Sequence, residues 1–409
     1  MGLDRVHAVW QQMGRPSAPI NITVGGTNGK GSTCAMMEAM LTAAGYKTGF
    51  YSSPHLVHFN ERVRIGAASA SDGDFERAFQ TVEVARMVLR PTVALTYFEY
   101  ATLAALAIFS QREVDVAILE VGMGGRLDAV NIVDADVSIV VSVDLDHQSF
   151  LGDSIEKIGW EKAHIYRPGR PAIFADLQPP ASLLAHAAEI GADLRLLHRD
   201  YRYERMDGQW QFIGRESTRH SLPFPALRGG YQLKNAAAAL AALDALRHKL
   251  PISQSQIKQG LLAVQWPGRM QVLPGRPTVV LDVAHNPHAA RALHEALGAM
   301  EYFENTHAVF SMLNDKDIDS VIDIIKSRID FWYVAGLEKS AGARASSSAA
   351  LAEKLRARGV TAGVAQYLDV HAAYAAAKAA AAQNDRILVF GSFHTVADVL
   401  DTLNPSPAH

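Results

Sequence analysis

Short runs of β-branched and apolar residues alternate along this chain with longer stretches of helical periodicity. Such alternation is typical of parallel sheets whose strands are connected by helices lying on the sheet faces. In the first part of the chain it predicts strands at 22–25, 48–51, 116–120 and 137–143, with helices near 32–44, 98–110 and 155–164. The predicted fold class is therefore α/β.

The alternation restarts after Trp266-Pro267-Gly268, with strands predicted at 278–282, 308–311, 331–334 and 387–390. A chain of 409 residues also suits two domains at roughly 100–200 residues each. We place them at 1–267 and 268–409. Between the strand patterns, Asp207-Gly208 predicts the turn of a hairpin within 201–213, and the alanine-rich run 372–382 predicts a packed helix.

The composition excludes several classes of partner. Net charge is −3 and the pI is about 6.6, so no bulk positive field is available for nucleic acid or an anionic membrane surface. The single cysteine, Cys34, cannot form an intrachain disulfide, which favours a reducing compartment. No signal-peptide core and no apolar run of membrane-spanning length are visible. We expect a soluble, cytoplasmic protein.

The strongest local signal is a strand that runs into a glycine-rich turn and then an amphipathic helix. Its turn reads Gly-Gly-Thr-Asn-Gly-Lys-Gly-Ser and contains Thr27, Asn28, Gly29, Lys30, Gly31 and Ser32. Glycines let backbone N–H groups converge on phosphate oxygens, and the helix N-terminus and a lysine add positive charge. Gly31 intervenes before Ser32, so this is a variant of the common P-loop. The alternative is a glycine-rich turn with an exposed lysine.

Polar side chains also follow other predicted strands. Glu120 ends one strand, where a magnesium ligand belongs beside a phosphate loop; a turn cap is the alternative. The next strand leads into Asp144, Asp146 and His147, and an isolated histidine would more often be structural. Ser53 follows the strand predicted at 48–51, where its hydroxyl could bind metal or phosphate or simply stabilise a turn.

Three further residues are candidates with open alternatives. Lys162 lies on a predicted helix; a desolvated lysine can take up carbon dioxide as a carbamate and bind a second magnesium, whereas its spacing alone favours a solvated helix lysine. Asp282 ends a strand and is placed to bind a ribose. Arg269 could reach a phosphate or stack on a base. For the last two, a helix cap or a surface ion pair is the alternative.

Taken together, these motifs resemble the folylpolyglutamate synthase and dihydrofolate synthase family of the Mur ligase superfamily. The resemblance rests on Gly-Thr-Asn-Gly-Lys-Gly-Ser, Ser-Ser-Pro-His-Leu, Thr-Tyr-Phe-Glu, Leu-Glu-Val-Gly-Met-Gly-Gly-Arg-Leu-Asp, Glu-Lys-Ala, Asp-Val-Ala-His-Asn-Pro-His and Phe-Gly-Ser-Phe-His. They span nearly the whole chain in family order. The resemblance implies a P-loop ATPase domain with a mostly parallel sheet, followed by a smaller Rossmann-like glutamate-ligase domain.

The resemblance also implies roles for individual residues. The implied metal ligands are Ser53, Glu120, His147 and carbamylated Lys162, and the implied catalytic residues are Lys30, Lys162, His147 and His285. ATP contacts map to Thr27, Asn28, Gly29, Lys30, Gly31, Ser32, Asn235, Arg269 and Asp282. Pterin-side contacts map to Thr96, Tyr97, Phe98, Glu99, Leu127, Asp128 and Ala129. Two Mg²⁺ sites are implied, and the pattern leaves room for K⁺.

The implied activity is an ATP-dependent ligase, expected to act as a monomer. It would add L-glutamate to dihydropteroate and to reduced folates through an acyl phosphate. Family members usually carry a segment ahead of the stretch that here is Gly2 to Val6, so we expect a shortened start to weaken dihydropteroate use. Two alternatives remain. A muramyl peptide ligase would use the same chemistry, although the Glu-Val-Gly-Met-Gly-Gly-Arg stretch argues against it; a nucleotide-binding switch would bind ATP or GTP without ligation.

Overall fold

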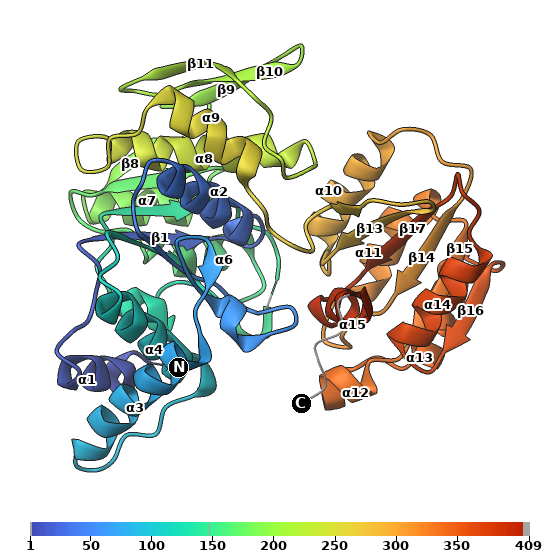
Figure 1. Ribbon diagram of the computed structural model, residues 1–409, viewed down its shortest axis with the longest axis horizontal. Helices are drawn as coiled ribbons and strands as arrows, with labels where there is room; N and C mark the ends of the chain where they lie inside the picture. Colours follow the sequence, from blue (N-terminus) through green and yellow to red (C-terminus); the bar gives the residue numbers. More distant parts are fainter. Residues whose placement is uncertain (1, 147, 404–409) are drawn as a thin grey trace. The chain divides into compact units, whose positions relative to one another are not determined.

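A computed structural model of the chain describes residues 2–146 and 148–403. The chain divides into two compact units. The first comprises Met1–His55, Phe59–Ala226 and Gln232–Gln265, and the second comprises Leu56–His58, Leu227–Tyr231 and Trp266–His409. In Figure 1 the first unit runs from blue to yellow and the second from orange to red. Both units contain mostly parallel sheets with helices on their faces, so the predicted α/β class is confirmed.

The first unit is built on an eight-stranded sheet in the order β4-β3-β2-β5-β1-β6-β7-β8. The two strands at one edge, β3 and β4, run antiparallel, and the remaining pairs are parallel. The strands are β1 (Ile20–Gly25), β2 (Thr48–Tyr51), β3 (Val63–Ile65), β4 (Ala68–Ser69), β5 (Val116–Glu120), β6 (Val137–Val140), β7 (Pro171–Phe174) and β8 (Asp193–Leu196).

Helices cover both faces of this sheet, as Figure 1 shows. On one face, Tyr51, Ala117 and Leu119 pack in a single core cluster with apolar residues of α1 (Asp4–Gln12), α3 (Asp72–Val88) and α4 (Tyr97–Gln111). On the other face lie α2 (Lys30–Ala43) and α9 (Gln254–Ala263), which pack against each other. The remaining helices are α5 (Gln148–Leu151), α6 (Ile155–Ala163), α7 (Ala181–Glu189) and α8 (Tyr231–Ala245).

The strands predicted in the first unit are all present, although two of their ends differ: β1 begins at Ile20, two residues before the predicted start, and β6 ends early. The strand predicted at 137–143 stops at Val140. The next residues bind the end of β1 and the turn after it: Val141 N donates to Gly25 O, and Ser142 O accepts from Thr27 N, each at 2.9 Å. The strands absent from the prediction, such as β4, β7 and β8, are short and lie toward the sheet edges.

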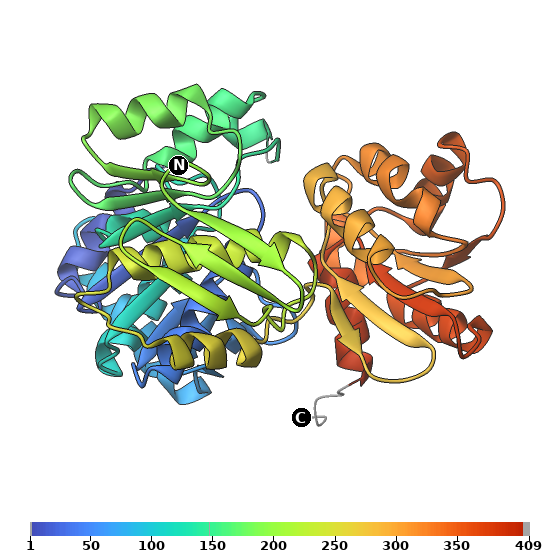
Figure 2. The ribbon, with the colours of Figure 1, turned by 90° about the horizontal axis from the view of Figure 1, so that it is seen from above.

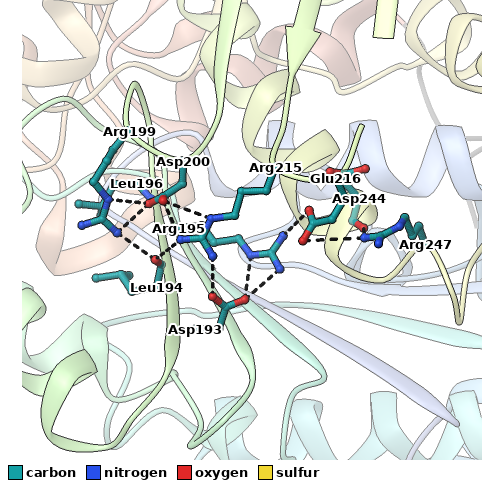
Figure 3. Close-up of polar contacts among 10 residues, drawn as sticks. All are labelled: Asp193, Leu194, Arg195, Leu196, Arg199, Asp200, Arg215, Glu216, Asp244 and Arg247. Atoms are coloured by element: carbon teal, nitrogen blue, oxygen red, sulfur yellow. Dashed lines mark hydrogen bonds and ion pairs between the residues drawn. The ribbon is translucent and has the colours of Figure 1, made fainter. Parts of the chain in front are cut away.

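The predicted hairpin is also present and belongs to a separate antiparallel sheet. Its strands are β9 (Arg202–Met206), β10 (Gln209–Ile213) and β11 (Thr218–Leu222), in the order β11-β10-β9. Figure 1 shows this sheet next to α8 and α9, and Figure 2 shows its strands from above. A network of arginines and carboxylates joins the connections of this sheet to β8 and α8 (Figure 3). Its members are Asp193, Arg195, Arg199, Asp200, Arg215, Glu216, Asp244 and Arg247.

The second unit has a six-stranded sheet in the order β12-β13-β17-β14-β15-β16, parallel except for β12. Alternate strand residues face two separate cores: Val280 and Phe310 pack with α10, α11 and α13, and Leu281 and Val309 pack with α14 and α15. The strands are β12 (Gln271–Leu273), β13 (Thr278–Asp282), β14 (Thr306–Phe310), β15 (Phe331–Ala335), β16 (Val364–Tyr367) and β17 (Arg386–Phe390). The helices are α10 (Pro287–Gly298), α11 (Ile318–Ile325), α12 (Glu338–Ala341), α13 (Ser348–Ala357), α14 (Val370–Ala380) and α15 (Phe393–Leu403).

The alanine-rich run forms α14, as predicted, and buries Ala373 and Ala377 against the sheet. Among the described residues, no helix has both the length and the apolar character needed to cross a membrane.

Candidate active site

The glycine-rich turn between β1 and α2 has the geometry of a phosphate-binding loop. Gly29 caps α2 with φ of +86°, a left-handed conformation that favours glycine, and a Cβ there would lie 2.7 Å from Asn235 Oδ1. The helix starts at Lys30, so Gly31 and Ser32 lie in its first turn. Lys30 Nζ donates to the carbonyl oxygens of Gly26 (3.0 Å) and Thr27 (3.3 Å). The lysine therefore folds back over the turn that would hold phosphate.

The segment after β6 fixes the shape of this loop. Thr27 Oγ1 donates to Asp144 O at 3.1 Å and accepts from Asp144 N at 3.0 Å. Ser142 Oγ accepts from Asn28 N and donates to Asn28 O, both at 3.0 Å. These reciprocal bonds hold the loop without using the backbone N–H groups at the start of α2, which a bound phosphate needs.

The N-terminal end of α8 lies against the same loop. Gln232 is buried, donates through Nε2 to Ser32 Oγ (3.4 Å) and accepts from Asn235 Nδ2 (2.9 Å). The structure thus brings the predicted nucleotide contact Asn235 beside Gly29. Gln232 was not singled out from the sequence, where no local motif marks it.

Glu120 ends β5 next to this loop, since it is paired in register with Val24 of β1. Its side chain is buried. Cys34 lies one helical turn into α2, near both Glu120 and Lys30. Burial raises the pKa of its thiol, the Glu120 charge raises it further, and the Lys30 charge lowers it. On the other side of β5, β2 pairs Tyr51 with Leu119, so Ser53 follows the adjacent strand beside Glu120.

Lys162 is buried on α6, with 4% exposure, so the alternative of a solvated lysine is wrong. Burial, together with the Lys30 charge, lowers the pKa of its ammonium to about 7, although the charges of Asp146 and Asp128 act in the opposite direction. The glycine-rich stretch after β5 makes this placement feasible. A Cβ at Gly125 would lie 2.6 Å from Glu161 O and 3.0 Å from Lys162 O, so only glycine allows this close approach.

Asp128 lies on the same stretch and is fully enclosed. Its oxygens accept from Met123 N (2.9 Å) and Val130 N (3.0 Å), and it caps the short helix η2 (Ala129–Ile132). Burial raises the pKa of its carboxyl to about 6, although these hydrogen bonds and the Lys30 charge lower it. Its neighbours in the predicted pterin segment, Leu127 and Ala129, therefore occupy a rigid turn.

The other predicted pterin segment forms the start of α4. Thr96 Oγ1 accepts from Glu99 N (3.3 Å) and Glu99 Oε2 accepts from Thr96 N (2.7 Å), which makes a capping box. This capping role was not predicted, although the Thr-x-x-Glu spacing before an apolar run signals it. Glu99 also pairs with Arg5 at 3.1 Å. Phe98 packs against Gly122, and Tyr97 is 62% exposed.

The second unit gathers its own predicted residues. Arg269 lies over the ring of Phe393 (5.0 Å to its centroid), and His285 lies 6.0 Å from the same ring. His285 Nδ1 donates to Val283 O at 2.9 Å. Asp282 accepts from Met270 N and Ala284 N, both at 2.8 Å, so both carboxylate oxygens support the backbone, and burial raises its pKa while Arg269 opposes the rise.

Comparison with known proteins identifies the family. The chain matches the Mur ligase middle domain over residues 24–243 and the Mur ligase glutamate ligase domain over residues 268–393. It is 44% identical over 406 residues to the dihydrofolate synthase/folylpolyglutamate synthase of Escherichia coli K12, covering 99% of this chain and 92% of that protein. The chain belongs to the dihydrofolate synthase/folylpolyglutamate synthase family.

Solved structures of the family have the same fold. E. coli FolC in complex with DHPP and ADP is 43% identical and superposes with a TM-score of 0.92, covering 99% of this chain and 93% of that one. A bifunctional folylpolyglutamate synthase/dihydrofolate synthase with Mn, AMPPNP and L-glutamate bound is 42% identical, with a TM-score of 0.90 over 99% and 94% of the two chains. The family resemblance found in the sequence is therefore confirmed.

Of the four metal ligands predicted for this chain, the structure describes three. His147 lies outside the described residues. Within residues 2–146 and 148–403, no three His, Cys, Asp or Glu side chains cluster as a ready metal site. The donors still fit a divalent ion, since Glu120 is a buried carboxylate beside the phosphate loop and Ser53 follows the neighbouring strand.

The structure thus separates the predicted site residues into two groups. In the first unit, Lys30, Glu120, Asp128 and Lys162 lie within electrostatic reach of shared neighbours at the carboxyl edge of the sheet. In the second unit, Arg269, Asp282 and His285 gather at the carboxyl end of β13. Both groups lie where ligands bind in α/β sheets.

Proposed function

We propose that this chain is an ATP-dependent ligase that adds L-glutamate to dihydropteroate and to reduced folates through an acyl phosphate. One observation carries the proposal: Lys30 of the phosphate-binding loop acts electrostatically on the buried Asp128 and Lys162, and both Lys30 and Glu120 act on the buried Cys34. Such an arrangement suits transfer of a phosphoryl group to a carboxylate, where negative charge gathers on the transferred oxygens. The amine of glutamate then displaces phosphate and forms the amide.

The candidate site residues of the first unit have distinct roles in this reaction. The N–H groups at the start of α2 and the Lys30 ammonium bind the phosphates and offset their charge. Asn235 and Ser32 complete the nucleotide site. Ser53, Glu120, His147 and modified Lys162 would hold Mg²⁺, which when bound neutralises phosphate charge and orients the γ-phosphate. Leu127, Asp128, Ala129 and residues 96–99 contact the pterin side of the substrate.

Carbamylation of Lys162 is supported by its surroundings. Only a free amine reacts with carbon dioxide, and burial brings the pKa of Lys162 to about 7, so a large share is uncharged at neutral pH. The modification would replace one of two nearby ammonium groups with an anion. Intact-protein mass spectrometry at neutral pH, with and without added bicarbonate, tests for the expected mass increase.

The second unit supplies the remaining roles. We assign ATP binding to residues 1–267 and glutamate ligation to residues 268–409, with Arg269 and Asp282 at the nucleotide and His285 as a catalytic residue. K⁺ remains a prediction. We expect a monomer in the cytoplasm, consistent with a single cysteine that is buried and free of any disulfide.

Release of ADP tests the proposal directly. We expect ADP release only when dihydropteroate or tetrahydrofolate and L-glutamate are both present. Lys30→Ala and Glu120→Ala should each abolish it, whereas the control Lys157→Ala, at an exposed pair with Asp153, should not. ADP release without either acceptor would favour the nucleotide-binding switch. Turnover of a muramyl nucleotide substrate in place of folates would favour a muramyl peptide ligase.

A further inference from the structure

A buried arginine, Arg62, lies beside the end of β2, at the carboxyl edge of the large sheet. Arg62 ends the short helix η1 (Phe59–Arg62) and is 7% exposed. Its guanidinium lies against two adjacent aromatic rings, 5.6 Å from the centroid of Phe59 and 5.2 Å from that of Tyr97, and the two rings meet edge to face at 5.9 Å. Its Nε donates to His55 Nδ1 at 2.8 Å. Because that nitrogen accepts, the His55 ring is neutral, so no charge of His55 adds to or offsets that of Arg62.

Arg62 has no acidic partner among the described side chains. Arg64, two residues later, pairs with Glu38 at 3.0 Å, but no carboxylate makes a comparable contact with Arg62 within residues 2–146 and 148–403. Its other polar neighbour is the Tyr51 hydroxyl. A buried guanidinium is normally compensated by a carboxylate, and stacking on aromatic rings offsets only part of the lost hydration. A ligand anion would therefore be strongly favoured here.

The place of Arg62 in the fold indicates which ligand. Arg62 O accepts from Ser52 N at 2.9 Å, which sets the arginine beside the end of β2 and the predicted metal ligand Ser53. Tyr97 stands in the first turn of α4, within the predicted pterin segment. The charge of Asp128 reaches the Tyr51 hydroxyl from the other pterin segment. Arg62 thus lies between the groups expected to bind the pterin and those expected to bind phosphate.

We propose that Arg62 binds a carboxylate of the pterin-bearing substrate, with Phe59 and Tyr97 holding the guanidinium and His55 fixing its orientation. This inference rests on the proposed function and adds a substrate-binding residue to it. The substrates of that reaction carry a carboxylate beyond an aromatic ring, which matches an arginine placed between an exposed tyrosine and the phosphate loop.

Binding measurements separate this inference from the proposed function. The probes are dihydropteroate and its decarboxylated analogue, in which aniline replaces the benzoate, each titrated calorimetrically into the ADP-saturated protein. For Arg62→Met we expect the Kd for dihydropteroate to rise about 10- to 100-fold, the loss of one charge-assisted hydrogen bond. The Kd for the analogue and for ADP should stay within about twofold, since neither uses the arginine.

Two controls keep the outcome decisive. Arg77→Met removes the charge of an exposed arginine that pairs with Asp74 and should change neither Kd. Arg62→Lys keeps the charge but loses the planar guanidinium. We expect it to raise the Kd for dihydropteroate less than Arg62→Met does and to leave the Kd for the analogue unchanged. This variant replaces Arg62→Met if that variant does not fold. Equal losses for both probes, or none for either, would overturn the inference. Failure of the wild-type protein to release ADP would instead refute the proposed function, because these titrations require no turnover.

Discussion

Two clusters of charged side chains in the first unit are arranged in opposite ways. In the network of Figure 3, each arginine contacts a carboxylate: Arg195 reaches Asp193 and Glu216, and Arg215 reaches Asp193 and Asp200, at 2.6–2.9 Å. At the carboxyl edge of the large sheet, Lys162 and Asp128 are buried, and neither makes an ion pair with any described residue.

The difference separates a structural from a functional use of charge. The network neutralises itself and joins β8, the hairpin sheet and α8, so it needs no ligand. At the edge site, burial lowers the pKa of Lys162 to about 7 and raises that of Asp128 to about 6. Groups held in this way gain most from a ligand that supplies the missing charges.

The largest expected effect comes from breaking the edge site. Lys162→Met should lower glutamate-dependent ADP release by about 100- to 1,000-fold, because a metal ligand is lost. Thermal stability should not fall, because the change removes an uncompensated buried charge. Lys157→Met, at an exposed pair on the same helix, is the control. Preserved activity with an early thermal transition would make Lys162 a structural residue.

A buried ion pair outside both clusters tests whether burial alone can shift a pKa, because it makes the free energy of unfolding depend on pH. Glu38 pairs with Arg64 at 3.0 Å, yet burial raises the pKa of its carboxyl from 4.5 to about 7. Because the folded state holds the Glu38 proton more tightly than the unfolded state, Glu38 contributes to the free energy of unfolding below about pH 4.5. This contribution is lost as the pH rises through about 7. Relative to Glu38→Gln, the wild-type unfolding free energy should fall by about 2–3 kcal/mol over that range.

Urea unfolding at pH 5, 6, 7 and 8 measures this difference. Glu76→Gln, at an exposed position of α3, controls for the loss of one negative charge. A gap between wild type and Glu38→Gln that stays constant with pH would show that the carboxyl is ionised throughout.

Breaking the structural network should lower stability and leave catalysis unchanged. Asp200 accepts from Leu196 N and from Arg199 and Arg215 at 2.6–2.8 Å. Asp200→Asn should reduce the unfolding free energy by about 1–2 kcal/mol, since it weakens charge-assisted hydrogen bonds at a largely buried group. The KM values should not change. Asp207→Asn, at the exposed hairpin turn, is the matched control; equal effects would mean that the network adds nothing.

The smallest effect is expected at Gln232. This residue lies on α8, the helix that also carries Asp244 of the charged network. Gln232→Met removes the hydrogen bonds to Ser32 and Asn235 and should raise the KM for ATP about tenfold, with a smaller change in kcat. Gln232→Glu can still accept from Asn235 and should recover part of the affinity. Gln111→Met, at an exposed helix end, is the control. A kcat loss with unchanged KM would contradict a positioning role.

Much of the fold could be predicted because its signals are local. The strands at 48–51, 116–120 and 278–282 were predicted to the residue, since buried parallel strands are continuous apolar runs. The strands β8, β12 and β16 were not predicted, because edge strands such as Asp-Leu-Arg-Leu carry polar residues that no periodicity separates from loops. The end of β6 was misjudged because the residues after Val140 bind the phosphate loop, which lies far away in sequence.

The sequence by itself determined the order of elements, the glycine-rich loop and the family, because these depend on residue types at short spacing. Tertiary structure alone decided that Lys162 is buried, that Asp128 is enclosed and that Arg62 lies against two rings with no acidic partner among the described residues. The physical reason is that the energy of a charge depends on what surrounds it. Those surroundings come from segments that lie far apart along the chain.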